Sequence, residues 1–132
     1  MSFISADQLL CHAIGDYILQ SHWMATEKTN NSFAAFLHAA SYALPFLFLR
    51  PSYAALAIIV TTHFIIDRWR LARLLVTYKN ALTDFSNEHT YKPFWTPTGY
   101  PADTPPWLAF WLLIIADNIM HAVINGLALR YL

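Results

Sequence analysis

The sequence predicts an all-α protein: a four-helix integral membrane bundle with a long third helix and a loop rich in proline and aromatic residues before the last helix. Three observations support this prediction. Of the 132 residues, 57% are hydrophobic and 12% are charged, whereas soluble domains carry about 25% charged residues. The apolar residues fall into four segments of helical length. In three of these segments a histidine and an aspartate are four residues apart, which places both on one face of a helix.

The first predicted helix covers residues 3–24, where polar residues interrupt the apolar ones. His12, Asp16 and Gln20 follow one another at four-residue steps, so we expect them on the inward face. A short polar turn, residues 27–32, separates this helix from the next.

The second predicted helix covers residues 33–49 and ends at Arg50 and Pro51. Its one strongly polar interior residue is His38. Pro45 lacks the backbone N–H that an α-helix needs, so it predicts a kink.

The third predicted helix covers residues 53–82 and is apolar as far as Ile66. It carries His63 and Asp67 at a four-residue spacing. Beyond Asp67 arginine and lysine alternate with leucine, which indicates a helix that leaves the membrane and continues along its interface.

Residues 83–106 contain five prolines together with several aromatic residues, so we expect an ordered surface loop. The fourth predicted helix covers residues 107–131. Asp117, His121 and Asn125 lie at four-residue steps on one of its faces. The whole chain is expected to form a single domain.

Charge indicates an orientation in the membrane. If the four spans alternate, the basic residues gather on the side of Lys28, and the positive-inside rule places that side in the cytoplasm and both termini outside it.

Lys28 is the first positive charge, so we expect no cleavable signal peptide. The chain has 8 basic and 8 acidic residues, which gives no reason to expect nucleic acid as a partner. The single cysteine, Cys11, excludes an internal disulfide.

Three aspartates lie away from the ends of the predicted spans, Asp16, Asp67 and Asp117, and each has a histidine four residues away. A carboxylate at a helix centre costs roughly 2.5–3.5 kcal/mol in a membrane, and a divalent cation would compensate several at once. Imidazole and carboxylate suit zinc, and also iron or manganese. Seven candidate ligands are enough for two ions that share a bridge: His12, Asp16, His38, His63, Asp67, Asp117 and His121.

Such a centre supplies a nucleophile, because metal-bound water ionises near neutral pH. The sequence therefore predicts a metal-dependent hydrolase that acts on a lipid, an acylated or phosphorylated amphiphile, or another small molecule. One of Asp16, Asp67 and Asp117 would serve as general base. Three cations are candidates for substrate binding: Lys28, Arg68 and Arg70. Three amides are candidates for orienting the ligands: Gln20, Asn118 and Asn125.

Three other interpretations remain open. The His/Asp pairs could be a purely structural network between helices. They could form a proton or cation pathway, since intramembrane carboxylates beside titratable histidines are typical of transporters. The chain could also be a non-enzymatic interaction protein that contacts a partner through its aromatic loop. Oligomerisation is left open.

The chain resembles an uncharacterised family of small bacterial and phage membrane proteins, domain of unknown function 3307. The resemblance rests on residues 12–20, then Trp23 to Ala25 with Lys28, then His38, residues 63–67 and residues 117–121. It implies an integral protein of the bacterial inner membrane. This sequence departs from the family pattern at two places that concern the residues expected to face the substrate. Arg68 and Arg70 occur where such proteins tend to have a lysine, and Asn118 occurs where they have a glutamine. The pattern is also broadly similar to membrane-bound metal-dependent hydrolases.

Overall fold

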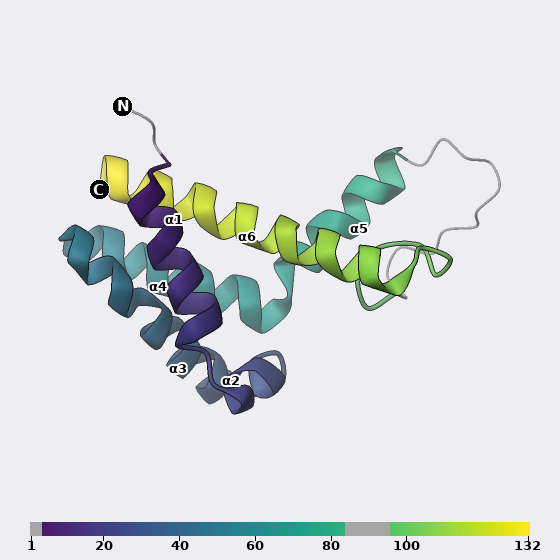
Figure 1. Ribbon diagram of the computed structural model, residues 1–132, viewed down its shortest axis with the longest axis horizontal. Coiled ribbons are helices and arrows are strands. Elements are labelled where there is room, and N and C mark those ends of the chain that lie inside the picture. The colour runs from purple at the N-terminus through teal and green to yellow at the C-terminus, as the bar shows by residue number, and fades with distance from the viewer. Residues whose placement is uncertain (1–3, 84–95) are drawn as a thin grey trace. The chain divides into compact units, whose positions relative to one another are not determined.

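A computed structural model describes residues 4–83 and 96–132, and every regular element within these ranges is a helix (Figure 1). The prediction of an all-α protein is confirmed for this part of the chain. The chain divides into two compact units, Met1–Trp69 with Met120–Leu132, and Arg70–Ile119. The two units are described separately below.

The structure divides the first predicted helix, 3–24, into three elements. They are α1 (Ala6–Ala13), a π-helical turn η1 (Ile14–Ile18) and α2 (His22–Glu27). The hydroxyl of Ser21 accepts a hydrogen bond from the backbone N–H of Met24. A serine in this N-cap position starts a new helix, which explains why the predicted single helix is interrupted.

The second predicted helix begins as α3 (Ser32–Ala43), capped by the Asn31 side chain, and continues as the 3₁₀ helix η2 (Leu44–Leu49). Pro45 cannot donate an α-helical hydrogen bond, so the chain changes to the tighter helix at this point. Arg50 ends η2 in the left-handed conformation, with φ of 51°.

The third predicted helix is also divided. It consists of α4 (Tyr53–Trp69) and α5 (Leu71–Thr83), and Arg70 separates them with a left-handed φ of 53°. A residue in this conformation cannot continue a right-handed helix. The division places α4 in the first unit and α5 in the second.

The first unit is built around α3, which packs along α4 and against α2 and η1 (Figure 1). Buried alanines on α3, including Ala35 and Ala39, let the neighbouring backbones approach closely. Tyr42, Phe46 and Ile59 are the large side chains of the apolar core.

Gly15 allows η1 to lie against α3. A Cβ atom at this position would be 2.7 Å from the backbone oxygen of Tyr42 and 2.7 Å from its ring, closer than packed atoms can come. The glycine therefore brings the next residue, Asp16, to the surface of α3.

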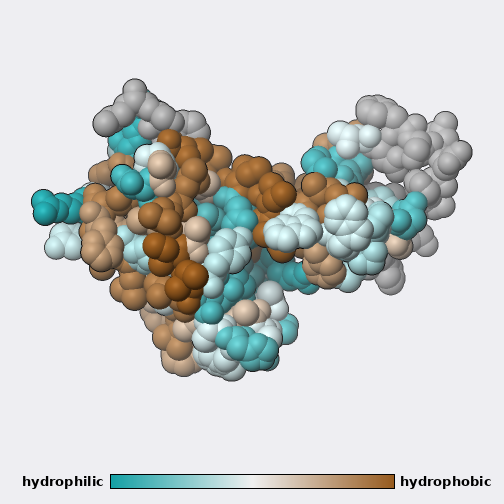
Figure 2. Space-filling model, viewed as in Figure 1, coloured by the Kyte–Doolittle hydropathy of each residue, from teal (hydrophilic) through white to brown (hydrophobic). Residues whose placement is uncertain are grey.

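Within residues 4–83 and 96–132, two helical stretches are long and apolar enough to cross a membrane: α3 with η2, Ser32–Leu49, and Pro106–Tyr131. The latter is α6 (Pro106–Tyr131), close to the predicted 107–131. Many large apolar side chains of the first unit face outward, among them Leu10, Phe36 and Phe48. Figure 2 shows apolar residues over α1 and α3 and hydrophilic residues over α2. The predicted association with a membrane is thus supported for two of the four expected spans.

The second unit contains α5 and the beginning of α6. Residues 96–100 lie against α5, because Arg73 donates to the carbonyl of Thr96 and Asn80 donates to the carbonyl of Gly99. Gly99 has φ of 81°, and a Cβ there would be 2.8 Å from the carbonyl oxygen of Arg73. This end of the predicted loop 83–106 is ordered, and its residues 84–95 lie outside the described part of the chain.

Candidate metal centre

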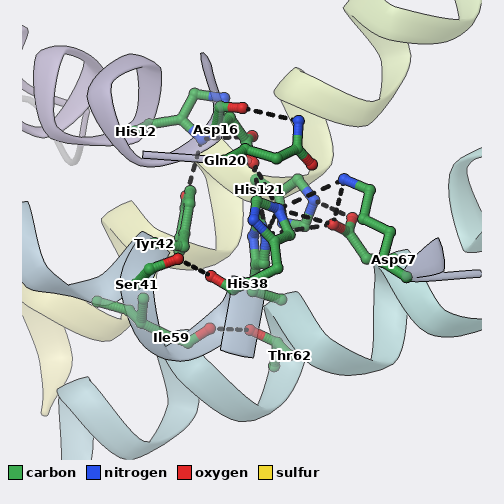
Figure 3. Close-up of polar contacts among 12 residues, drawn as sticks. His12, Asp16, Gln20, His38, Ser41, Tyr42, Ile59, Thr62, Asp67 and His121 are labelled. Atoms are coloured by element: carbon green, nitrogen blue, oxygen red, sulfur yellow. Dashed lines mark hydrogen bonds and ion pairs between the residues drawn. The ribbon is translucent and has the colours of Figure 1, made fainter. Parts of the chain in front are cut away.

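Four buried side chains from three elements of the first unit converge at one place. Asp16 comes from η1, His38 from α3, and His63 and Asp67 from α4. Each of the four is buried, and both histidines are fully so. Figure 3 shows Asp16, His38 and Asp67 pointing toward one another from separate helices.

Five of the six pairs among the donor atoms of these residues have a spacing close to that of a tetrahedral metal site. Nε2 of His38 lies 2.9 Å from Nε2 of His63, 3.3 Å from Oδ1 of Asp16 and 3.1 Å from Oδ2 of Asp67. Nε2 of His63 lies 3.4 Å and 3.3 Å from the same two oxygens. Metal bonds of about 2.0–2.1 Å correspond to donor separations of about 3.3–3.4 Å in a tetrahedron. All four donor atoms lie within 4.8 Å of one another, so together they could hold a metal ion.

Two more histidines contact the other oxygens of the two carboxylates. Nε2 of His121, on α6, lies 3.3 Å from Oδ1 of Asp67. Nδ1 of His12 lies 3.5 Å from Oδ2 of Asp16. Both histidines were predicted as metal ligands, and this role stays a prediction; in the structure each lies beside one carboxylate of the four-donor group.

Tyr42 is a component of the site that the sequence analysis missed. Its ring is fully buried and stacks on the His63 ring, with centroids 3.7 Å apart and an angle of 16°. Its hydroxyl lies 2.8 Å from Nδ1 of His12 and accepts a hydrogen bond from the amide of Asn125. Tyr42 thus links α3 to α1 and α6 behind the donors.

We expect Tyr42→Phe to lower the free energy of unfolding by about 1–3 kcal/mol, because His12 and Asn125 each lose a buried hydrogen-bond partner. Tyr53→Phe is the matched control, since Tyr53 is 94% exposed, and we expect no change. Chemical unfolding in detergent would measure both variants. Equal stability of the two would contradict the structural role of the Tyr42 hydroxyl.

Three side-chain amides of this unit contact backbone carbonyls or Tyr42 and not the four donor atoms. Gln20, predicted to orient a ligand, donates to the backbone carbonyl of Asp16. Asn125, also predicted to orient a ligand, acts through Tyr42. Gln8 was missed: it is buried and donates to the carbonyl of Ala122 at 2.7 Å. Gln8 and Tyr42 stand four residues from His12 and His38, so the spacing that found the aspartates would have found them too.

The three predicted substrate-binding cations have different surroundings. Nζ of Lys28 lies 2.7 Å from Oδ2 of Asp67. Arg68 donates to Ser32 Oγ and to two backbone carbonyls, those of Thr29 and Asn30. Arg68 therefore holds the turn before α3.

Three of the predicted site residues belong to the second unit: Arg70, Asp117 and Asn118. Arg70 donates to the carbonyl of Pro97 at 2.8 Å, within that unit. Asp117 and Asn118 are half-buried on α6, and Asp117 lies one turn before His121 on the same helix. The role of Asp117 and the second ion stay predictions.

The fold and the site define an all-helical protein with a buried cluster of aspartate and histidine that could hold a metal ion. The chain belongs to the family described as a protein of unknown function (DUF3307), whose family model matches residues 4–93. The matched range includes all four donors and ends before α6. No curated protein and no solved structure matches the chain.

Proposed function

We propose that this chain is a membrane-embedded metalloprotein that binds a divalent ion at Asp16, His38, His63 and Asp67 and hydrolyses an amphiphilic substrate. The observation that carries the proposal is the spacing of the four buried donor atoms, 2.9–3.4 Å for five of their pairs. The donor oxygens of the two buried carboxylates lie within 4.8 Å of each other, and a divalent ion would offset their charge.

Zinc suits this donor set best. Two imidazole nitrogens and two carboxylate oxygens in a tetrahedron are typical zinc ligands, and iron or manganese are the next candidates. The gathering of the donors at one point supports a metal centre over a proton or cation pathway, which would spread its ionisable groups along the path of the ion.

The hydrolytic step needs a water molecule and a proton acceptor. A divalent ion held by these residues would lower the pKa of water and polarise the bond to be cleaved. A site with four protein ligands has no position for water, so one carboxylate, that of Asp16 or Asp67, would leave the ion during the hydrolytic step and accept a proton from water. The oxygen of this water would form a bond to the carbon or phosphorus of the substrate. The bond to the leaving oxygen breaks, and this oxygen takes up the proton.

The membrane supplies the substrate in this proposal. We place the chain in the bacterial cytoplasmic membrane with four spans and both termini outside the cytoplasm. The two apolar helices and the outward-facing aromatic and aliphatic side chains support this location. α4 has 17 residues, about 26 Å of helix, so its charged end at Arg68 lies at the interface of a hydrocarbon core of about 30 Å.

Elemental analysis of the full chain, purified in detergent without chelator, tests the proposal. We expect one equivalent of zinc, iron or manganese per chain in the four-donor site. A protein that contains no divalent metal and takes none up on reconstitution would overturn the proposal. Ion flux into liposomes that continues under exhaustive chelation would favour the transport function instead.

A further inference from the structure

Lys28 contacts two of the atoms that would bind the metal. Its Nζ lies 2.7 Å from Oδ2 of Asp67 and 3.4 Å from Nε2 of His38. Oδ2 of Asp67 is also a corner of the tetrahedral donor set. The ammonium group and a metal ion would therefore compete for the same carboxylate oxygen.

Charge balance favours one cation or the other. With neutral histidines, the carboxylates of Asp16 and Asp67 and the ammonium of Lys28 leave one net negative charge in a buried site. A divalent ion added beside the ammonium would leave one net positive charge. A divalent ion in place of the ammonium leaves none, and a neutral set of charges is the least costly to bury.

The side chain of Lys28 is able to leave the cluster. It is 20% exposed, whereas that of Asp67 is 4% exposed. Lys28 is the residue that ends α2, and Arg68 holds the backbone just after it through the carbonyls of Thr29 and Asn30. Only the flexible four-carbon side chain of Lys28 has to move.

We infer that Lys28 exchanges with the metal: it neutralises Asp67 in the metal-free protein, and once the metal binds it turns outward and binds a phosphate group of the substrate. An ammonium group beside a divalent ion is a strong site for a phosphate. The inference rests on the proposed function and specifies its substrate class, a phosphate-bearing amphiphile.

Lys28→Met tests the exchange because it should change two affinities in opposite directions. Without the competing ammonium, we expect the affinity for zinc to rise about fivefold or more. We expect the zinc-loaded variant to bind inorganic phosphate about tenfold or more weakly than the zinc-loaded wild type. Titration calorimetry of the full chain in detergent measures both. Lys79→Met is the matched control, since Lys79 is an exposed lysine of the second unit, and it should change neither affinity.

Each result has a definite meaning. An unchanged or lower zinc affinity of the Lys28→Met variant overturns the exchange but leaves the proposed metal centre intact. An unchanged phosphate affinity overturns the substrate class. If neither the wild type nor the variant binds zinc, the proposed function itself fails. Micelles containing phosphatidic acid, compared with inorganic phosphate, distinguish a lipid headgroup from the free ion as the preferred source of phosphate.

A second measurement uses the wild-type protein and so does not depend on the folding of a variant. Lysine acetylation is followed by mass spectrometry with and without zinc. The exchange predicts that zinc increases the modification of Lys28 about threefold or more, as the ion pair with Asp67 is lost, while Lys79 is modified equally in both states. Protection of Lys28 by zinc would overturn the inference.

Discussion

Replacing His63 with alanine should remove the bound metal. His63 supplies one of four donor atoms and is fully buried, so water cannot readily take its place. Structural zinc sites with four ligands bind with about 10–16 kcal/mol, which is roughly 3 kcal/mol per ligand. We therefore expect the zinc affinity to fall about a hundredfold or more, with the metal lost during purification. Elemental analysis of the variant is the measurement.

His22→Ala is the matched control for this experiment. His22 is an exposed residue of α2. The His22→Ala variant should therefore have the same metal content as the wild type. If the His63→Ala variant keeps its full metal content, the four-donor centre is wrong. If both variants lose the metal, the loss reflects general instability and the His63 result does not support the site.

The second large effect concerns the stability of the protein with and without zinc. A ligand that binds the folded state alone stabilises it by about 4 kcal/mol at a thousand times its dissociation constant. We expect this stabilisation for the wild type and at most about 1.4 kcal/mol for Asp16→Asn, if the loss of one ligand lowers the affinity about a hundredfold. In the presence of a chelator we expect the Asp16→Asn variant to be less stable than the wild type, because the buried carboxylate of Asp16 lies within 3.5 Å of three histidine nitrogens and loses these contacts. Chemical unfolding in both conditions measures the effect.

Asp7→Asn makes the same change at an exposed position in the first turn of α1. This control should keep the whole stabilisation by zinc. Zinc stabilisation of the Asp16→Asn variant equal to that of the wild type would show that Asp16 does not bind the ion. If zinc does not stabilise the wild type, the proposed metal centre is wrong.

Much of the local structure was predictable from the sequence. Apolar segments of helical length gave the all-α class, and the bounds of α6 differ from the prediction by one residue at its start. Helix capping and backbone conformation set where individual helices begin and end, which hydrophobic periodicity alone does not predict. Ser21 begins α2 within the first predicted helix, and Arg70 ends α4 within the third, because a side-chain cap or one left-handed residue ends a helix without changing its hydrophobic pattern.

The sequence by itself determined the helical class and the residues able to bind a metal, because spacing along a helix places His63 and Asp67 on one face whatever the rest of the chain does. Only the tertiary structure decided which candidates share one point. It joined Asp16 and His38 to that pair, brought His121 to Asp67, and paired Lys28 with Asp67. These contacts join residues far apart in the chain, and packing between helices, not spacing along one of them, sets the distances between their side chains.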